Sequence, residues 1–555
     1  MRATTMTKSN SIARLLLAPM MAMFLAVAAH ASTPGISAAG GSAGTFNLTA
    51  QTAFLNQPDG SSVYSWGYGC VNGVATFAAT VGSATFPNQN CPTMQVPGPT
   101  LVVTEGQTVT VILTNNLPTA AGNTSILFPG FQVTPTGGVP GLLTQEAAPA
   151  GTVTYTFTAV SPGTHAYYSG TQGDLQIEMG LYGAIIVLPK AVPAACTSGL
   201  SAANVQVELA HGEQDFRLSP AAYDHAKSCY DREYLFQWAE MDPNIHKQAL
   251  AQVAAKNGCT AGAPGCTLEV PTEPYHPGYF LINGRSMPDL MDANYAAEYP
   301  HQPYNGNPHM HPGEQVLVRA IGQGRWQHPF HEHGNHVRIL GRDGNLIVSA
   351  SDPNSLAGLL MFNTDTTPGQ AFEGIFYWTG RGLNWDPYGH HPGADAFGDT
   401  LAVQNCYPDS NGYYTVNSTP AAPVGAINYY EWCQDHNKPV EANPAGDVAS
   451  GGPTTLPDPN IFTNGPWYGG TPYLGPDATL RAFAPNCTVN NNNGSQTCSQ
   501  QQPSNTQANP PNERGYAFMW HSHNEREITT NNVFPGGMLM MMLVDSREFV
   551  IDESN

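Results

Sequence analysis

The chain has 555 residues, of which only 11% are charged, and its formal net charge at neutral pH is -21. Such a charge argues against nucleic acid or an anionic membrane as a partner, and it disfavours acidic, carbohydrate-rich substrates. The length suits two or more domains, and 57 glycines with 47 prolines favour short strands and many turns over helices.

The first residues have the features of an export signal. Arg2, Lys8 and Arg14 form a positive start, and the apolar stretch LLLAPMMAMFLAVAA leads to AHA, a typical cleavage site. No later stretch is long and apolar enough to span a membrane, and no twin-arginine pair precedes the apolar stretch. We therefore expect a signal peptide over residues 1–31, with an uncleaved anchor as the alternative, and a periplasmic or secreted protein.

From residue 44 to residue 190 the sequence predicts strands and turns. The segment TLVVTEGQTVTVILTNNLP alternates apolar and polar residues around a Glu-Gly pair, which predicts a strand, a turn and another strand. The segments GTVTYTFTAV and GAIIVLP continue the pattern. Their number and length predict one Greek-key β-sandwich over residues 44–190.

A second unit, residues 200–555, begins near VQVELAHGEQDF and contains one clear helix. Asp242 is placed to cap its start, Pro243 suits its first turn and Gly258 its end. Strands are predicted again at GYFLING, GEQVLVRAIG, HVRILGRDGNLIVS, FEGIFYWTG and YAFMWHSH. The Gly-, Pro- and Asn-rich stretch at about 386–514 is predicted to be an insertion, because a loop of that length is unusual within a compact domain.

The ten cysteines all lie outside the histidine motifs described next. An even number of cysteines after an export signal predicts disulfides that tie loops together. The sequence leaves the connectivity open, and pairing between neighbours along the chain is one hypothesis. It joins Cys70 with Cys91, Cys196 with Cys229, Cys259 with Cys266, Cys406 with Cys433, and Cys487 with Cys498.

Two H-x-H pairs carry the strongest functional signal. In HPFHEHGNH, strand alternation places His331 and His333 on one face, and in WHSHNERE it does the same for His521 and His523. Imidazole clusters suit copper or zinc. A lone histidine is usually a core or surface residue, but two such pairs in an exported β-protein predict a metal site.

Other histidines have a weaker pattern. His309 and His311 form HMH, which can bind copper(I), yet a short loop motif of this kind is more often without a metal. The pair His390 and His391 has the same default interpretation. We expect these four histidines to lie outside the main site, while leaving open that His309 or His311 supplies a further ligand.

Several motifs together resemble the multicopper oxidase family, which is built from cupredoxin domains. These are VPGPTLVVTEGQTVTVILTNNLP and GTHAYYSG…GLYGAIIVLP in the first half, and INGRSMPD, HPFHEHG and WHSHNERE…GGM in the second. INGR runs into GEQVLVRAIG and HPFHEHG without room for a middle domain. The resemblance therefore implies the two-domain type related to copper nitrite reductases. It implies an all-β fold of tandem cupredoxin-like Greek-key β-sandwiches, copper as cofactor and, by analogy, a homo-oligomer, a trimer.

The first domain departs from the family pattern. Where the family has its first H-x-H, this chain has Leu127 and Pro129, and where the family has H-S-H it has Tyr168 and Gly170. Leucine, proline and glycine side chains cannot coordinate a metal, and a neutral phenol is a poor ligand. Half of the family's trinuclear ligands are therefore absent, although Tyr168 remains a candidate for one vacated position.

The second domain keeps its share of the family's copper ligands. By the resemblance, His331 corresponds to a type 2 copper ligand, and His333 and His521 correspond to a pair on one type 3 copper. His523 corresponds to a ligand of the other type 3 copper. The resemblance thus implies a reduced site of four histidines within one domain.

The family's electron-entry site is also altered. His328 is retained and is a further candidate ligand, but Ser522 replaces the thiolate and Glu527 replaces the second histidine. Met538 corresponds to the axial methionine at a longer spacing. A serine hydroxyl is a poor copper ligand, and blue copper depends on the bond between copper and thiolate. We expect no blue type 1 copper.

Three functional hypotheses follow from this pattern. The first is an exported copper-binding protein with a four-histidine site. The second is a copper-dependent oxidoreductase, either multicopper oxidase-like or a mononuclear or dinuclear copper enzyme. Such an enzyme would take electrons from an external small-molecule reductant or redox partner, or would use peroxide or superoxide. The third is a non-catalytic scaffold whose histidines bond to one another or bind zinc. Four convergent buried imidazoles argue against the third, because buried polar groups need partners. The sequence assigns no catalytic residue and no substrate.

Overall fold

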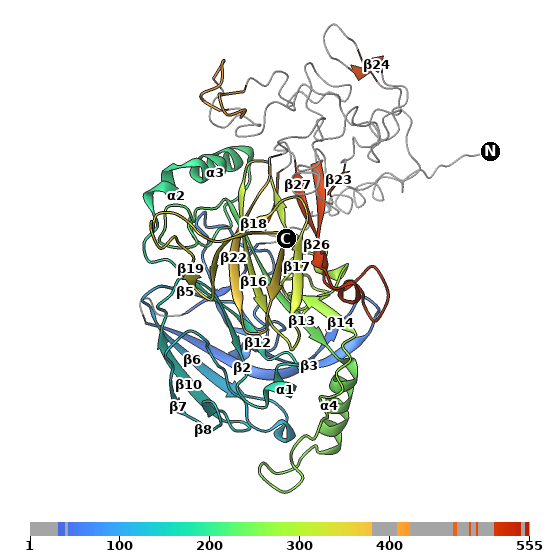
Figure 1. The fold of residues 1–555 in the computed structure, drawn as a ribbon. Coiled ribbons are helices and arrows are strands. Elements are labelled where there is room, and N and C mark those ends of the chain that lie inside the picture. Colours follow the sequence, from blue (N-terminus) through green and yellow to red (C-terminus); the bar gives the residue numbers. More distant parts are fainter. Residues whose placement is uncertain are drawn as a thin grey trace, which may run out of the picture.

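The computed structural model describes residues 32–38, 43–379, 408–413, 415–421, 470–473, 488–489, 496–497, 515–545 and 550–553. Within these residues the fold is built from two pairs of β-sheets with few helices, as predicted (Figure 1). The first pair, coloured blue to cyan, lies below the second pair, coloured green to red. The predicted signal peptide and most of the predicted insertion lie outside the described residues.

The first pair of sheets comes from the first third of the chain. One sheet has the order β11 (Gly163–Tyr168), β12 (Tyr182–Leu188), β5 (Leu101–Thr104), β1 (Ile36–Ser37) and β4 (Thr76–Phe77). The other has the order β3 (Ser62–Cys70), β2 (Ala43–Asn56), β6 (Thr108–Asn115), β10 (Thr152–Thr158) and β7 (Thr134–Gly137). The short strands β8 (Val139–Pro140) and β9 (Gln145–Glu146) form a separate hairpin.

The alternating pattern around β5 and β6 explains this sandwich. Val109, Val111 and Leu113 on β6 are fully buried, while the residues between them face outward. Each fully buried side chain of this kind contributes roughly 1.5–3 kcal/mol relative to an exposed one. Gly106, between the two strands, has φ +83°, a conformation that glycine adopts without strain. The predicted strand, turn and strand are confirmed, with the two strands in different sheets.

The second pair of sheets holds the histidine motifs. One sheet has the order β14 (Tyr279–Ile282), β13 (Arg232–Met241), β16 (Gln315–Gly322), β22 (Ala371–Tyr377), β18 (Val337–Arg342) and β19 (Asn345–Leu346), with β20 (Leu360–Met361) on β18. The other has the order β15 (His309–Met310), β27 (Leu539–Asp545), β26 (Gly515–Ser522), β17 (His328–Glu332) and β21 (Asn363–Thr366), with β23 (Gly470–Tyr473) on β26. Another short pair is β24 (Thr488–Val489) with β25 (Gln496–Thr497).

Aromatic side chains fill the space between the sheets of the second pair. The ring of Phe330 on β17 lies 4.7 Å from Trp238 and 5.9 Å from Trp520, measured between centroids. All three residues are fully buried. This packing fixes β17 and β26 from the inner side, so that the outward-facing histidines of both strands stand on a rigid base.

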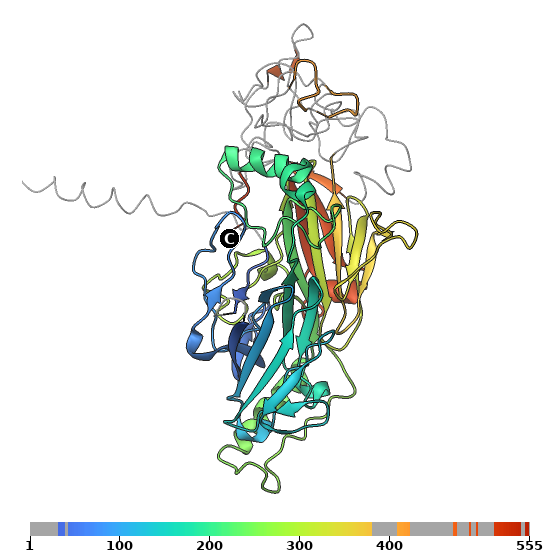
Figure 2. The same ribbon diagram turned by 90° about the vertical axis from the view of Figure 1, so that its left-hand side faces the viewer.

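The described helices include one that was predicted and one that was not. The helix α4 (Pro243–Ala255) begins at Asp242, whose carboxylate accepts the amide of Asn244 at 2.9 Å, which confirms the predicted cap. Ile245 and Ala249 of α4 pack into the core of the first pair of sheets, and Figure 2 shows this helix at their end of the molecule. Sequence analysis missed α3 (Leu200–His211). The remaining helical segments are α1 (Gly173–Gln176), α2 (Ala194–Ser198), η1 (Val71–Gly73), η2 (Thr119–Ala121), η3 (Asp289–Met291) and η6 (Glu525–Ile528).

Three of the five hypothesised disulfides are present. They join Cys70 to Cys91, Cys196 to Cys229 and Cys259 to Cys266. The cysteines of the other two pairs lie outside the described residues. In the part of the chain that the structure describes, no helix is long and apolar enough to cross a membrane.

Candidate metal centre

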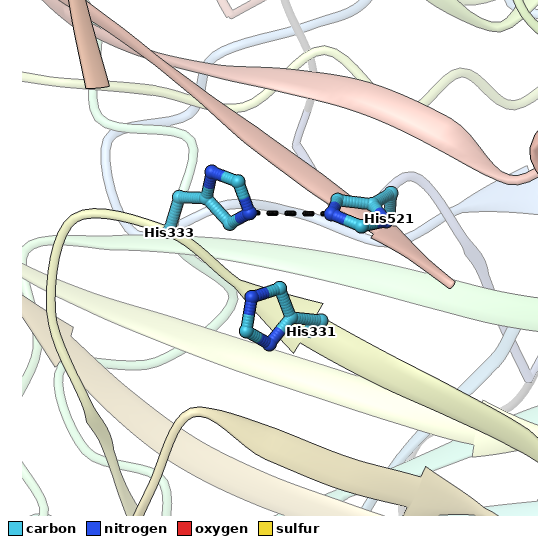
Figure 3. A group of neighbouring side chains, drawn as sticks. All are labelled: His331, His333 and His521. Carbon is cyan, nitrogen blue, oxygen red and sulfur yellow. Dashed lines mark hydrogen bonds between the residues drawn. The ribbon is translucent and has the colours of Figure 1, made fainter. Parts of the chain in front are cut away.

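The pairing of β17 with β26 brings the two H-x-H motifs together. The strands run antiparallel, and their register places His331 directly opposite His521. His333 lies just beyond the end of β17, where the chain turns back over the sheet. Figure 3 shows the imidazoles of His331, His333 and His521 pointing toward one another from these two segments. The predicted grouping of these residues therefore rests on one strand register.

The ring nitrogens in this cluster are close enough to share one ion. The Nε2 atoms of His333 and His521 are 3.2 Å apart, and one ligand nitrogen from each of His331, His333 and His521 lies within 4.8 Å of the others. The ring of His523 lies 4.7 Å from that of His331 between centroids, so the fourth histidine borders the same space.

Burial of the cluster is graded from inside to outside. His331 and His521 are buried, His333 is half-buried and His523 is exposed. Burial, followed by the neighbouring imidazoles, lowers the pKa of His331 to about 4, and burial also lowers the pKa of His521. Both rings are thus neutral near pH 7, which is the form that binds a metal.

The orientation of His521 is set by a backbone carbonyl. Its Nδ1 lies 2.7 Å from the carbonyl oxygen of Ser522, and because a carbonyl only accepts, Nδ1 carries the hydrogen. The lone pair is therefore on Nε2, the atom that faces His333. Metal-binding histidines in proteins commonly donate their second N–H in this way.

The donor set fits a small transition-metal ion. Two nitrogens bound to one ion at about 2.0–2.1 Å lie roughly 3.3 Å apart when the angle between the bonds is tetrahedral. The distance of 3.2 Å between Nε2 of His333 and Nε2 of His521 agrees with that value. An all-imidazole set suits copper or zinc, and the general affinity order favours copper(II).

His328 is not part of this cluster. Its Nδ1 lies 2.9 Å from Oε2 of Glu527, and its Nε2 lies 2.9 Å from Oε2 of Glu240 on β13. Burial lowers the pKa of His328, but its hydrogen bonds to the two carboxylates outweigh burial and raise the pKa to about 9, so the ring is a buried imidazolium that donates from both nitrogens. With both nitrogens engaged in this way, His328 offers no lone pair to a metal.

The residues that replace the electron-entry ligands surround His328. The hydroxyl of Ser522 donates to Oε2 of Glu527, and Nδ2 of Asn524 donates to Oε1 of the same carboxylate at 2.8 Å. Met538 is fully buried, and its backbone amide donates to the carbonyl of Glu527. Charged hydrogen bonds thus occupy the position where the family's thiolate and second histidine would stand.

His309 and His311 bond to carboxylates elsewhere in the second pair of sheets. Nδ1 of His309 lies 2.6 Å from Oδ2 of Asp545, and Nε2 of His311 lies 2.6 Å from Oε1 of Glu213. Neither belongs to the histidine cluster. The other pair singled out in the sequence, His390 and His391, lies outside the described residues.

Packed side chains occupy the first-domain positions at which the family resemblance would place copper ligands. Leu127 and Tyr168 form a β-bridge, and the side chain of Leu127 occupies the space beside Gly170, within 2.7–3.1 Å of where a Cβ would stand. A histidine at position 170 would therefore collide with Leu127. Tyr168 lines a cavity of about 160 Å³ with Ile177, Gln323, Gly324, Pro368 and Gly369, and none of the clustered histidines lines it.

Two neighbours of the site were missed from the sequence. Glu240 lies in a fully buried strand, β13, that was not predicted, and a carboxylate in the segment EYLFQWAEM was the one available signal. Phe362, which precedes β21, places its ring 5.8 Å from His331 and 5.0 Å from His336 between centroids, and it is 43% exposed. No sequence pattern pointed to Phe362.

Comparisons with known proteins agree on one family. The family model for multicopper oxidase matches residues 88–192. The chain is 34% identical to Laccase-1 of Emericella nidulans over 119 residues. This matched segment is 20% of this chain and 17% of that protein. The chain is 37% identical to multicopper oxidase MCE of Talaromyces pinophilus over 99 residues. This matched segment is 17% of this chain and 16% of that protein. Each match spans less than a fifth of the relative's length.

Two solved structures have partial similarity to the chain. The multicopper oxidase mgLAC has a TM-score of 0.42 at 14% identity, covering 90% of this chain and 86% of its own. A copper nitrite reductase from Nitrosomonas europaea has a TM-score of 0.36 at 20% identity, covering 60% of this chain and 84% of its own. The likeness rests on the sequence matches, in which residues 88–192 match the family model for multicopper oxidase.

Proposed function

We propose that this chain is a copper-binding protein that holds one non-blue copper ion through His331, His333, His521 and His523. The observation that carries this proposal is the convergence of two H-x-H motifs, with Nε2 of His333 and Nε2 of His521 3.2 Å apart. That spacing suits two ligands of one ion. The family match over residues 88–192 supports copper as the metal.

The reduced ligand set supports one ion over a full cluster. The first domain supplies Leu127 and Gly170 where coordinating side chains would be needed, and their mutual packing leaves no room for a histidine at position 170. The second domain alone offers four imidazoles, which is enough for one borderline ion. We propose the division into two cupredoxin-like domains, 44–190 and 200–555, as the framework for this single site.

A copper-dependent oxidoreductase is the second candidate function, and the graded burial of the site favours it. His523 is exposed and His333 half-buried, so a small molecule can approach the ion from solvent. Bound copper would supply one-electron chemistry. Because Ser522 and Glu527 replace the electron-entry ligands, electrons would come from an external small-molecule reductant or a redox partner.

We also propose that the protein is exported to the periplasm or the medium. The amino-terminal sequence has the features of a signal peptide, and three disulfides in the described part of the chain suit an oxidising compartment. Copper would then be acquired after secretion. A homo-oligomer, a trimer by analogy with the two-domain branch of the family, belongs to the same proposal.

Metal content and electron paramagnetic resonance test the copper proposal. Protein from the exported fraction, loaded with copper(II) and dialysed, should hold about one copper per chain and give a normal, non-blue spectrum. His333→Ala and His521→Ala should each abolish this signal. His225→Ala is the matched control, because this histidine is on the surface, where it bonds the carbonyl of Pro353.

Two results would contradict the proposal in different ways. A content near four coppers per chain with rapid, dioxygen-dependent oxidation of phenols would restore an ordinary multicopper oxidase. Retention of the signal in both cluster variants would show that the ion binds elsewhere. The second candidate function would be supported if protein with one copper per chain steadily oxidised a reducing phenol and His333→Ala abolished this activity.

A further inference from the structure

A buried network of charged and polar side chains lies next to the histidine cluster. Its members are Glu240 on β13, His328 on β17, Ser522 at the end of β26 and Glu527 in η6. All four are buried, with exposed fractions of 1% or less. His328 bridges the two carboxylates at 2.9 Å on either side, and Ser522 donates its hydroxyl to Glu527. We call these four residues the carboxylate–imidazole network.

Each charge in the network has several partners. Oε1 of Glu240 accepts the backbone amides of Arg325 and Trp326 at 2.8 and 2.9 Å. The hydroxyl of Tyr275 adds a third contact to that oxygen at 3.2 Å. Glu527 accepts from Asn524 through its other oxygen. These hydrogen-bond partners are required, because a buried charge without partners destabilises a fold by several kcal/mol.

The network reaches the metal centre through Ser522. The side chain of Ser522 is held by Glu527, and its carbonyl oxygen accepts Nδ1–H of His521 at 2.7 Å. His521 then presents Nε2 to His333. A shift of the Ser522 peptide would rotate the ring of His521 and move its free lone pair away from the shared ion.

We propose that the carboxylate–imidazole network positions His521 for metal binding. Glu240, His328 and Glu527 are positioning residues in this role, because they act through Ser522 and none of them contacts the ion. The proposal deepens the copper-binding function above, and its affinity test rests on that function. Outer partners of metal-binding histidines typically change metal affinity by roughly 10–100-fold when they are replaced.

Stability alone is a weak explanation for the network. Buried ion pairs are often replaced by well-packed apolar residues with no loss of stability, and sometimes with a gain. Two carboxylates and an imidazolium with one hydroxyl are therefore an unusual filling for this position. Because one of them bonds Ser522, the residue next to His521, they can have a function that an apolar filling would lack, namely to fix the direction of the Ser522 carbonyl.

Glu527→Ala is the main test, with Glu527→Gln as the conservative variant. Glutamine keeps an oxygen that can accept the Ser522 hydroxyl, whereas alanine removes it. Asp215→Asn is the matched control, because Asp215 is also buried and pairs with Arg217 at 2.8 Å, on the segment that precedes β13. The control thus breaks a buried ion pair that has no bond to Ser522.

The first measurement uses metal-free protein with ¹⁵N-labelled histidine, so that it does not depend on copper binding. In the wild type, Nδ1–H of His521 should give a slowly exchanging resonance that is absent in His521→Ala. We expect this resonance to be lost in Glu527→Ala, largely recovered in Glu527→Gln and unchanged in Asp215→Asn. A resonance that persists in Glu527→Ala would overturn the proposal.

The second measurement is copper(II) affinity with the paramagnetic resonance spectrum. Glu527→Ala should weaken binding roughly 10–100-fold and alter the copper hyperfine splitting, while Glu527→Gln and Asp215→Asn stay close to the wild type. Equal weakening in Asp215→Asn would reveal a general loss of stability and contradict the positioning role. If the wild type binds no copper, the proposed function fails, and the metal-free resonance alone decides on the network.

A milder variant, Glu240→Gln, tests the proposal if the Glu527→Ala protein does not fold. Glu240→Gln keeps the size of the side chain and an oxygen for the amides of Arg325 and Trp326, while it removes one charge from His328. We expect it to increase the exchange rate of Nδ1–H of His521. An unchanged exchange rate in a folded Glu240→Gln protein would also overturn the proposal.

Discussion

Replacement of His328 by glutamine should remove a specific part of the pH dependence of stability. His328 is fully buried between Glu240 and Glu527; burial lowers its pKa, but the hydrogen bonds that it donates to these carboxylates outweigh burial and raise the pKa to about 9. In the unfolded chain the pKa returns to about 6.5. Between these two values the folded protein therefore holds a proton that the unfolded chain has lost, and folding is stabilised by that difference.

The size and the window of the effect follow from the two pKa values. A rise in pKa from 6.5 to about 9 corresponds to about 3 kcal/mol. Because the folded pKa is raised, this contribution is complete below about pH 6.5 and is lost as the pH rises through 9. The neutral glutamine has no such contribution.

Urea unfolding of metal-free protein from pH 6 to pH 9.5 measures the effect. Tryptophan fluorescence follows the unfolding, and Trp238, Trp378 and Trp520, all fully buried beside the second pair of sheets, contribute to it. The stability difference between wild type and His328→Gln should shrink by about 3 kcal/mol across the window. Parallel curves for the two proteins would refute the assignment of a buried imidazolium.

Three further outcomes are expected. Ser522→Cys combined with Glu527→His should give copper-loaded protein the intense blue absorption that the wild type should lack. A thiolate and a second imidazole would then join His328 as copper ligands, and absorption spectroscopy of both proteins checks this. Gly170→Ala should destabilise the fold by about 1–3 kcal/mol through contact with Leu127, and Leu127→Ala in the same chain should recover part of the loss in a thermal melt. Wild-type protein denatured without reductant should show no free thiol in a thiol-reagent titration, and even one reactive thiol per chain would contradict the disulfide pairing.

The histidine cluster could be predicted because strand geometry is periodic. Alternation along a strand predicts one shared face for His331 and His333 and another for His521 and His523, without knowledge of the rest of the fold. In the structure β17 ends at Glu332 and β26 at Ser522, so the second histidine of each pair lies just past its strand. That the two pairs meet depends on the register between β17 and β26, which sequence spacing does not encode. The resemblance to a known family supplied that link.

The partners of His328 could be predicted only in part. Ser522 and Glu527 were visible as replacements for expected ligands, but their bonding to His328 was not, because it depends on the turn between β26 and η6. Glu240 comes from a strand 88 positions earlier in the chain. A contact of that separation leaves no local pattern, and charged residues in strands usually face solvent.

The two longer helices also differ in whether neighbouring residues in the sequence reveal them. The helix α4 was predicted from its own cap, because Asp242 and Pro243 act within a single turn. Sequence analysis missed the helix α3, which begins without a side-chain cap and has no acidic residue in its first turn. Its residues include Val205 and Val207, both buried, so tertiary packing outweighs the weak local signal for a helix.

The two positions at which the chain departs from the family's copper-ligand pattern differ from each other in how they are filled. In the first domain, Leu127 packs over Gly170, so an apolar contact has closed the position. In the second domain, the electron-entry position is filled by hydrogen-bonded charges, with Glu527 bonded to both His328 and Ser522. An apolar contact needs only complementary shape, whereas buried charges need every partner in place. Complementary shape alone accounts for the first arrangement. The second requires a reason to keep polar groups fixed beside the histidine cluster, and the bond from His521 to the carbonyl of Ser522 supplies one.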